Sequence, residues 1–146
     1  DGAFLYKFIS DESFKALEIY VSVYQNGELT GRYPVGLSNI FSSAHSEGMI
    51  AIVPDFENFA VKLVIASGSA KLSTDIPILE DVDGCEYLIR SAVQIDNTAN
   101  IRYDEEQFLL ALLYGKNELE VYDQSAYEKG DFKCDYAYLF SFKFAK

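Results

Sequence analysis

The chain has 146 residues, and its twelve basic against twenty-three acidic side chains give a net charge of -11. A surface of this sign repels nucleic acid and anionic membrane surfaces, and no apolar window is long enough for a membrane-spanning helix. The hydrophobic share of 49% and the aromatic share of 15% argue against a disordered chain. We therefore expect one acidic, soluble domain that covers residues 1–146.

Alternation of apolar and polar side chains dominates the first part of the chain and predicts strands. Phe4–Phe8 is a short aromatic-rich run, and Ala16–Tyr24 places aliphatic side chains at every second position. Asn26-Gly27 follows, and this pair favours a two-residue turn in which both residues have positive φ. We expect a hairpin whose return strand covers Glu28–Tyr33.

Two tyrosines lie on the face of the first hairpin strand that is opposite its aliphatic stripe. Tyr20 and Tyr24 are spaced for one sheet surface, where aromatic side chains can stack on sugar rings or bury against a partner protein. Ordinary cross-strand packing is the alternative. Tyr20 and Tyr24 are the ligand-binding candidates of this sequence.

The middle of the chain begins with a serine- and glycine-rich stretch over residues 35–48, which predicts a long surface loop. Its His45 is the only histidine, and no nucleophile motif accompanies it, so we interpret it as an exposed loop residue and expect no catalytic residues. Further strands are predicted by four apolar runs, Met49–Val53, Phe59–Ile65, Ala70–Ile78 and Tyr87–Ile95.

Between the last two runs lies ILEDVDGCEY, residues 78–87, with four acidic side chains around one glycine. Aligning Gly84 with the glycine of an EF-hand puts Leu79 and Arg90 at its first and last ligand positions, so that motif fails. The segment reads first as a turn. A calcium site of another design would use the three carboxylates Glu80, Asp81 and Asp83, with help from another loop such as 104–106. We expect no other cofactor.

Residues 104–115, DEEQFLLALLYG, fit two structures. Asp104 could cap a helix with Gly115 beyond its end, whereas Phe108–Tyr114 could be a buried strand that turns into the alternating segment 118–122. We favour the strand, because the apolar run is short and lies among strands with regular turn spacing. A helix here would change the class to α+β.

The segment Tyr136–Phe144 places five aromatic side chains on one face, as expected of a strand in a packed core. Its composition resembles that of Phe4–Phe8, so we expect both to lie in one sheet. With about eight to ten short strands and no repeats, the predicted fold is an all-β, antiparallel two-sheet β-sandwich, with a partly closed barrel as the alternative.

The two cysteines, Cys85 and Cys134, allow a single disulfide, and each follows an acidic, turn-like segment, 81–84 and 127–131. Their spacing leaves open whether they pair, and it does not fit a zinc site.

The β-rich pattern, the tyrosine content and the two cysteines point to a bacterial protein outside the cytoplasm, secreted or lipid-anchored through a removed leader. The sequence predicts a non-enzymatic binding or envelope-associated accessory domain. Its partner would be a protein; the alternatives are a carbohydrate-binding module with a loop calcium, and a small hydrolase that needs two facing carboxylates or His45.

Overall fold

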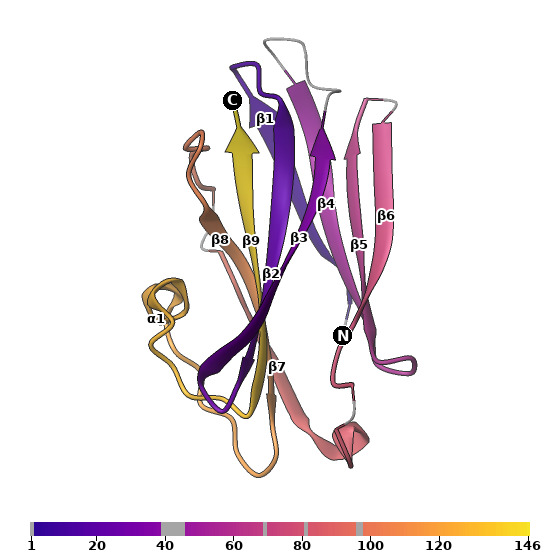
Figure 1. The fold of residues 1–146 in the computed structure, drawn as a ribbon, viewed down its shortest axis with the longest axis vertical. Helices are drawn as coiled ribbons and strands as arrows, with labels where there is room; N and C mark the ends of the chain where they lie inside the picture. The colour runs from indigo at the N-terminus through magenta and orange to yellow at the C-terminus, as the bar shows by residue number, and fades with distance from the viewer. Residues whose placement is uncertain (1, 39–45, 69, 81, 96–97) are drawn as a thin grey trace. The chain divides into compact units, whose positions relative to one another are not determined.

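The computed structural model describes residues 2–38, 46–68, 70–80, 82–95 and 98–146. It is nearly all β and contains two antiparallel sheets, one of four strands and one of five, which confirms the predicted all-β, two-sheet class (Figure 1). The chain divides into two compact units. Residues 1–16 and 37–86 form the four-stranded unit, and residues 17–36 and 87–146 form the five-stranded unit. The single domain over 1–146 stays a prediction.

The four-stranded sheet has the order β1-β4-β5-β6. Its strands are β1 (Phe4–Ser10), β4 (Ser46–Asp55), β5 (Ala60–Ser67) and β6 (Ala70–Pro77). All three neighbouring pairs are antiparallel. One face of this sheet is core, because its large apolar side chains are buried: Phe8, Ile50, Ile52, Val61, Leu63 and Ile65.

The opposite face of this sheet, here called the Leu5 face, is mixed, because it carries apolar side chains along β1, β4 and β5 together with the charged side chains of Lys7, Glu47, Asp55 and Lys62. Its apolar members are Leu5, Ile9, Met49, Ala51, Val53, Val64 and Ala66. Leu5 and Ile9 are 62% and 58% exposed. The central strands β4 and β5 therefore carry apolar side chains on both faces, a pattern typical of strands that are covered on both sides.

The five-stranded sheet has the order β3-β2-β9-β8-β7. Its strands are β2 (Ala16–Gln25), β3 (Glu28–Ser38), β7 (Ile89–Gln94), β8 (Gln107–Gly115) and β9 (Tyr136–Ala145). Asn26 and Gly27 join β2 to β3 with φ of 53° and 81°, which confirms the predicted two-residue turn. The aliphatic stripe of β2, Leu17, Ile19 and Val21, is buried as expected.

The segment that fitted both a helix and a strand is strand β8, so the favoured prediction is confirmed. Every residue of Gln107–Gly115 is buried. Leu110 and Leu112 lie opposite Phe140 and Tyr138 of β9, while Ala111 and Leu113 face the other side of the sheet. Burial on both faces explains why the sequence shows an uninterrupted apolar run and no alternation.

A short helix, α1 (Gln124–Lys129), covers the Ala111 side of the five-stranded sheet, here called the α1 face (Figure 1). Asp123 caps it by accepting from the backbone N–H of Ala126, and Gly130 ends it in the left-handed conformation. The turn expected over 127–131 is therefore wrong, since these residues include the end of a helix.

Three further expectations are wrong. The alternating segment 118–122 is not a strand, because Leu119 and Tyr122 pack on the α1 face without backbone pairing. The two aromatic strands Phe4–Phe8 and Tyr136–Phe144 lie in different sheets. The loop expected over 35–48 is shorter, since β3 continues to Ser38 and β4 begins at Ser46; residues 39–45 lie outside the described residues.

Cys85 and Cys134 are both free thiols, so the disulfide that the sequence allowed is absent. Cys85 begins the short 3-10 helix η1 (Cys85–Tyr87), and Cys134 is half-buried, with its Sγ 3.1 Å from the backbone oxygen of Tyr136. Burial raises the pKa of the Cys134 thiol. Within the described ranges, no helix is long and apolar enough to cross a membrane.

Candidate functional site

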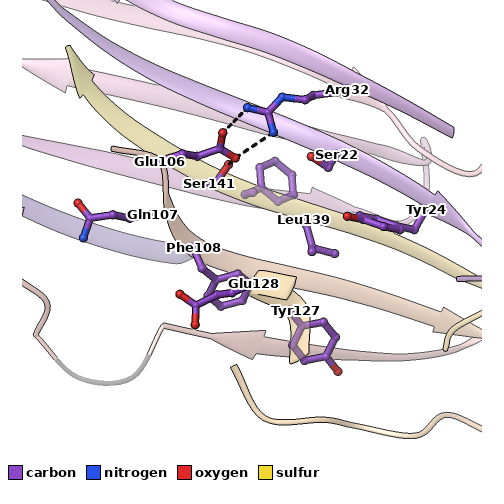
Figure 2. Close-up of a pocket in the computed structure, with 11 residues that line it drawn as sticks. Ser22, Tyr24, Arg32, Glu106, Gln107, Phe108, Tyr127, Glu128, Leu139 and Ser141 are labelled. Carbon is purple, nitrogen blue, oxygen red and sulfur yellow. Dashed lines mark hydrogen bonds and ion pairs between the residues drawn. The ribbon is translucent and has the colours of Figure 1, made fainter. Parts of the chain in front are cut away.

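A pocket of about 300 Å³ opens on the α1 face of the five-stranded unit (Figure 2). Strands β2, β3, β8 and β9 and helix α1 all contribute to it, so it lies where the helix meets the sheet. Its described lining residues are Ser22, Tyr24, Arg32, Glu106, Gln107, Phe108, Tyr127, Glu128, Leu139, Phe140 and Ser141. One side of the pocket is ionic and the other is aromatic.

The ionic side is built on Arg32 of β3 and Glu106, the residue before β8. Two guanidinium nitrogens of Arg32 donate to the two carboxylate oxygens of Glu106, one of them at 3.0 Å, so the pair is bidentate (Figure 2). Ser141 of β9 donates its hydroxyl to the same carboxylate at 2.6 Å. These donors hold the pKa of Glu106 below its usual range, the Arg32 hydrogen bond most strongly. Glu106 is therefore a fixed carboxylate.

The ring of Tyr20 packs against the guanidinium group of Arg32 on the ionic side. The guanidinium carbon of Arg32 lies 4.3 Å from the centre of the Tyr20 ring, which is the geometry of a cation–π contact. The Tyr20 hydroxyl donates to Glu18 at 2.5 Å, and this hydrogen bond is the main cause of the raised pKa of Tyr20. Arg32 is thus held by an ion pair on one side and by an aromatic ring on the other.

The aromatic side is built around Tyr127, which α1 inserts against the sheet. The Tyr127 ring stacks with Phe108 of β8 at 6.2 Å between centroids and packs against Phe132 at 5.0 Å. Phe132 in turn meets the edge of Tyr24 at 4.9 Å. The backbone N–H of Tyr122 donates to the Tyr127 hydroxyl at 3.0 Å, so the buried hydroxyl has a partner.

Gln107 fixes the segment that carries Glu106. This buried side chain donates to the backbone oxygen of Asn100 and accepts from the backbone N–H of Arg102, both at 2.9 Å. A buried amide that is bonded at both ends is costly to move. The carboxylate of Glu106 is therefore held in place from the backbone side as well as by Arg32.

The charge of the pocket is determined by Glu128 of α1. Arg32 and Glu106 neutralise one another, whereas the exposed Glu128 carboxylate has no ion-pair partner among the described residues. The pocket therefore has one negative charge in excess. A rigid aromatic wall beside an unpaired carboxylate suits a ligand with an apolar body and a cationic end.

The predicted ligand-binding tyrosines lie at this site. Tyr24 lines the pocket, and Tyr20 lies next to it under Arg32. Both are half-buried, on the face that the alternation predicted. Whether they bind a ligand stays a prediction.

The predicted metal residues are not in the pocket. Glu80 and Asp83 belong to the four-stranded unit, and Asp81 and His45 lie outside the described residues. Among the residues that the structure does describe, no group of three or more His, Cys, Asp or Glu side chains could hold a metal ion.

Residues 104–106 were the predicted source of further calcium ligands, and their carboxylates form other contacts. Asp104 accepts from the backbone N–H of Lys146 at 2.9 Å, and Glu105 lies 3.6 Å from Arg102. Glu106 belongs to the ionic side of the pocket.

Sequence reasoning missed Arg32 and Ser141. Regular pairing from the Asn26-Gly27 turn would place Arg32 opposite Val21, on the aliphatic face, but its contacts place the guanidinium on the α1 face. The alternation of β9 does put Ser141 and Leu139 on one face, and a search for polar residues on the less aromatic face would have found Ser141.

Comparison of the chain with protein-family models, with curated protein sequences and with solved structures finds no match.

Proposed function

We propose that the protein is a non-enzymatic binding domain that recognises a partner protein, and that the pocket on the α1 face takes a basic side chain of that partner. The observation that carries this proposal is the unpaired Glu128 carboxylate beside the aromatic wall. A lysine or arginine side chain has an aliphatic stem for Tyr24 and Leu139 and a cation for Glu128. The net charge of -11 would also attract a basic partner.

Binding is a better account of the pocket than catalysis. Glu106 and Glu128 are two carboxylates in one pocket, as a small hydrolase would need, but both oxygens of Glu106 are already occupied by Arg32 and Ser141. A carboxyl that gives or takes a proton needs an accessible oxygen and a pKa near the working pH. The lowered pKa of Glu106 fits a positioning role instead.

A glycan is the second candidate ligand. The aromatic side chains of the pocket offer rings on which a sugar could stack, and the exposed Glu128 carboxylate could accept from a sugar hydroxyl. A location outside the cytoplasm is part of the same proposal, because envelope proteins meet both partner proteins and glycans.

An NMR titration tests the proposal. N-acetyl-arginine amide and its neutral analogue N-acetyl-citrulline amide would be added to the ¹⁵N-labelled protein, with methyl glucoside as the sugar probe. We expect the arginine compound to shift the amide signals of Tyr24, Glu128 and Ser141 with a Kd of about 1 mM or below, and the citrulline compound to bind more weakly. Glu128→Gln should abolish this difference, while Glu118→Gln, an exposed acid away from the pocket, should preserve it.

Equal binding of arginine and citrulline compounds would remove the basic-side-chain assignment. Shifts of the same amides by methyl glucoside alone would favour the glycan. If no probe shifts them, the pocket is not the binding site.

A further inference from the structure

Strand β1 forms one edge of the four-stranded sheet, because β4 is its only neighbour within the described residues. An edge strand turns half of its backbone N–H and C=O groups away from the sheet, where another strand can pair with them. The hydrogen-bond alternation of the sheet identifies the residues of β1 that carry these outward groups.

The alternation is established at β5 and β6. The N–H of Ile78 donates to the oxygen of Phe59 at 2.9 Å, and these two residues lie opposite each other in the register of β5 and β6. From Phe59 onward, every second residue of β5 therefore points its backbone groups to β6, and the residues between them point to β4. Pro54 and Pro77 have no N–H, and this alternation turns the nitrogen of each away from β5, as proline requires.

Continued across β4, the alternation turns the backbone groups of Leu5, Lys7 and Ile9 outward, whereas Tyr6 and Phe8 point theirs to β4. No backbone hydrogen bond to another described residue reaches these outward groups. The side chains of the same residues are also open to solvent, since Leu5 and Ile9 are 62% and 58% exposed and Lys7 is exposed. An edge that combines open backbone groups with exposed apolar side chains is a surface for pairing with another chain.

The opposite edge of the sheet, β6, is built differently. Its outward residues are all exposed and polar, charged or proline: Lys71, Ser73, Asp75 and Pro77. Charged residues and proline on an edge strand oppose pairing with another chain. On β1, Lys7 is the one outward residue of this kind, so β1 is the edge of this sheet that is suited to accept a strand.

Lys7 determines which strand fits. A second copy of β1 in antiparallel pairing would use all the outward groups only with Lys7 opposite its own counterpart, and like charges directly opposite are destabilising. Glu47 of β4 shares the face of Lys7, but the register places it opposite Ile9, and Lys7 forms no ion pair with another described residue. A strand with an acidic side chain opposite Lys7 and apolar side chains opposite Leu5 and Ile9 would complement this edge.

We propose that the edge of β1 binds an extended segment of a partner protein, which adds to the four-stranded sheet as a further strand. The segment has an acidic residue at its centre and apolar residues two positions before and after it. This binding surface belongs to the four-stranded unit and goes beyond the proposed function of the pocket, which belongs to the five-stranded unit.

Amide hydrogen exchange of the ¹⁵N-labelled full chain tests this proposal. In the free protein we expect the amides of Leu5, Lys7 and Ile9 to exchange fast and those of Tyr6 and Phe8 to exchange slowly. The probe is the peptide acetyl-TVTETVT-amide, whose glutamate would lie opposite Lys7. At about ten times its Kd, the peptide should slow the exchange of the three outward amides about tenfold. The same peptide with N-methyl groups on its three central residues should leave the exchange unchanged.

The charge of Lys7 is tested separately. Replacing the glutamate of the peptide by lysine should weaken binding about fivefold, as expected from the loss of one exposed ion pair. Lys7→Glu should reverse this preference. Because the net charge of -11 repels an acidic peptide elsewhere on the chain, a preference for glutamate would be local to Lys7.

Two proline variants test the edge itself. Ile9→Pro should abolish peptide binding and keep the circular dichroism spectrum of the parent, because it removes an N–H that the sheet does not use. Ser73→Pro makes the same change on the edge of β6 and should leave peptide binding unchanged. Glu128→Gln at the pocket should also leave it unchanged, so failure here is distinguishable from failure of the pocket.

Three results would overturn the proposal: no slowing of exchange at the outward amides by the peptide, equal binding of the glutamate and lysine peptides, or unchanged binding to Ile9→Pro. Protection of the outward amides that rises with protein concentration in the absence of peptide would assign the edge to a second copy of the chain instead.

Discussion

Strands β8 and β4 have the same kind of sequence but different surroundings. Both contain an uninterrupted apolar run, Phe108–Tyr114 in β8 and Met49–Val53 in β4. β8 is buried along its whole length, because α1 and its flanking segments cover one face. Within the run Met49–Val53 of β4, Ile50, Ala51 and Ile52 are buried, while Met49 and Val53 are half-buried. An apolar run of this type is typical of a strand that is covered on both faces; β8 is buried on both, whereas Leu5 and Ile9 on the strand next to β4 are 62% and 58% exposed.

We expect the largest effect from a substitution that removes the cover provided by α1 on the α1 face. Tyr127→Ala should lower the free energy of unfolding of the protein by about 3–5 kcal/mol, because it deletes a buried ring that contacts Phe108 and Phe132. Urea unfolding followed by circular dichroism measures the change. Tyr127→Phe is the control, and it should cost only about 1 kcal/mol for the lost hydrogen bond from Tyr122. A loss below about 1 kcal/mol for the alanine variant would show that α1 contributes little to the fold.

A matched pair of leucines measures the difference between the two faces. Leu113 on the α1 face is fully buried and Leu5 is exposed. Leu113→Ala should lower the free energy of unfolding by about 2–5 kcal/mol, whereas Leu5→Ala should change it by no more than about 0.5 kcal/mol. The same urea experiment tests both. Equal losses would mean that the Leu5 face is covered in solution.

The smallest effect concerns the ion pair at the pocket. The folded pKa of Glu106 is lowered, so its stabilising contribution is present above the unfolded pKa of about 4.3 and is lost as the pH falls through the folded pKa. Because the carboxylate is partly exposed, Glu106→Gln should cost only about 0.5–1 kcal/mol at pH 7. Urea midpoints from pH 7 to pH 3 should converge with those of the parent at the acidic end. A constant difference over this range would rule out the charge of Glu106 as the cause, and Glu118→Gln is the control.

The sequence predicted strands well where local chemistry determines them. Asn26-Gly27 specifies its own turn, and the period-2 stripe of β2 specifies a buried face. β8 was predicted from the shortness of its apolar run, because a run that is apolar throughout has no periodicity that distinguishes a buried strand from a buried helix.

Helix α1 and the pocket were not predictable in the same way. Six residues are too few for a helical period, and α1 depends on Asp123 as its cap and on Tyr127 packing on the sheet. The Arg32–Glu106 pair joins β3 to the start of β8, two segments far apart in sequence, and pairing between single charges leaves no periodic signal. Tyr20 and Tyr24 are therefore the residues of this site that the sequence predicted as ligand-binding, because they follow the alternation of their own strand.

The neighbour relation of β2 and β9 also has a consequence for how the chain folds. The hairpin β2–β3 is local, but its next neighbour in the sheet is Tyr136–Ala145, and the backbone N–H of Asn26 donates to the oxygen of Asp135 at 3.0 Å. During synthesis the hairpin is therefore made long before the strand that completes it, with the backbone edge of β2 unpaired and its aliphatic stripe unprotected. Such long-range pairing slows folding and leaves an edge open to other chains. The five-stranded sheet can close only after β9 has left the ribosome, and until then we expect the hairpin to be the most aggregation-prone segment of the growing chain.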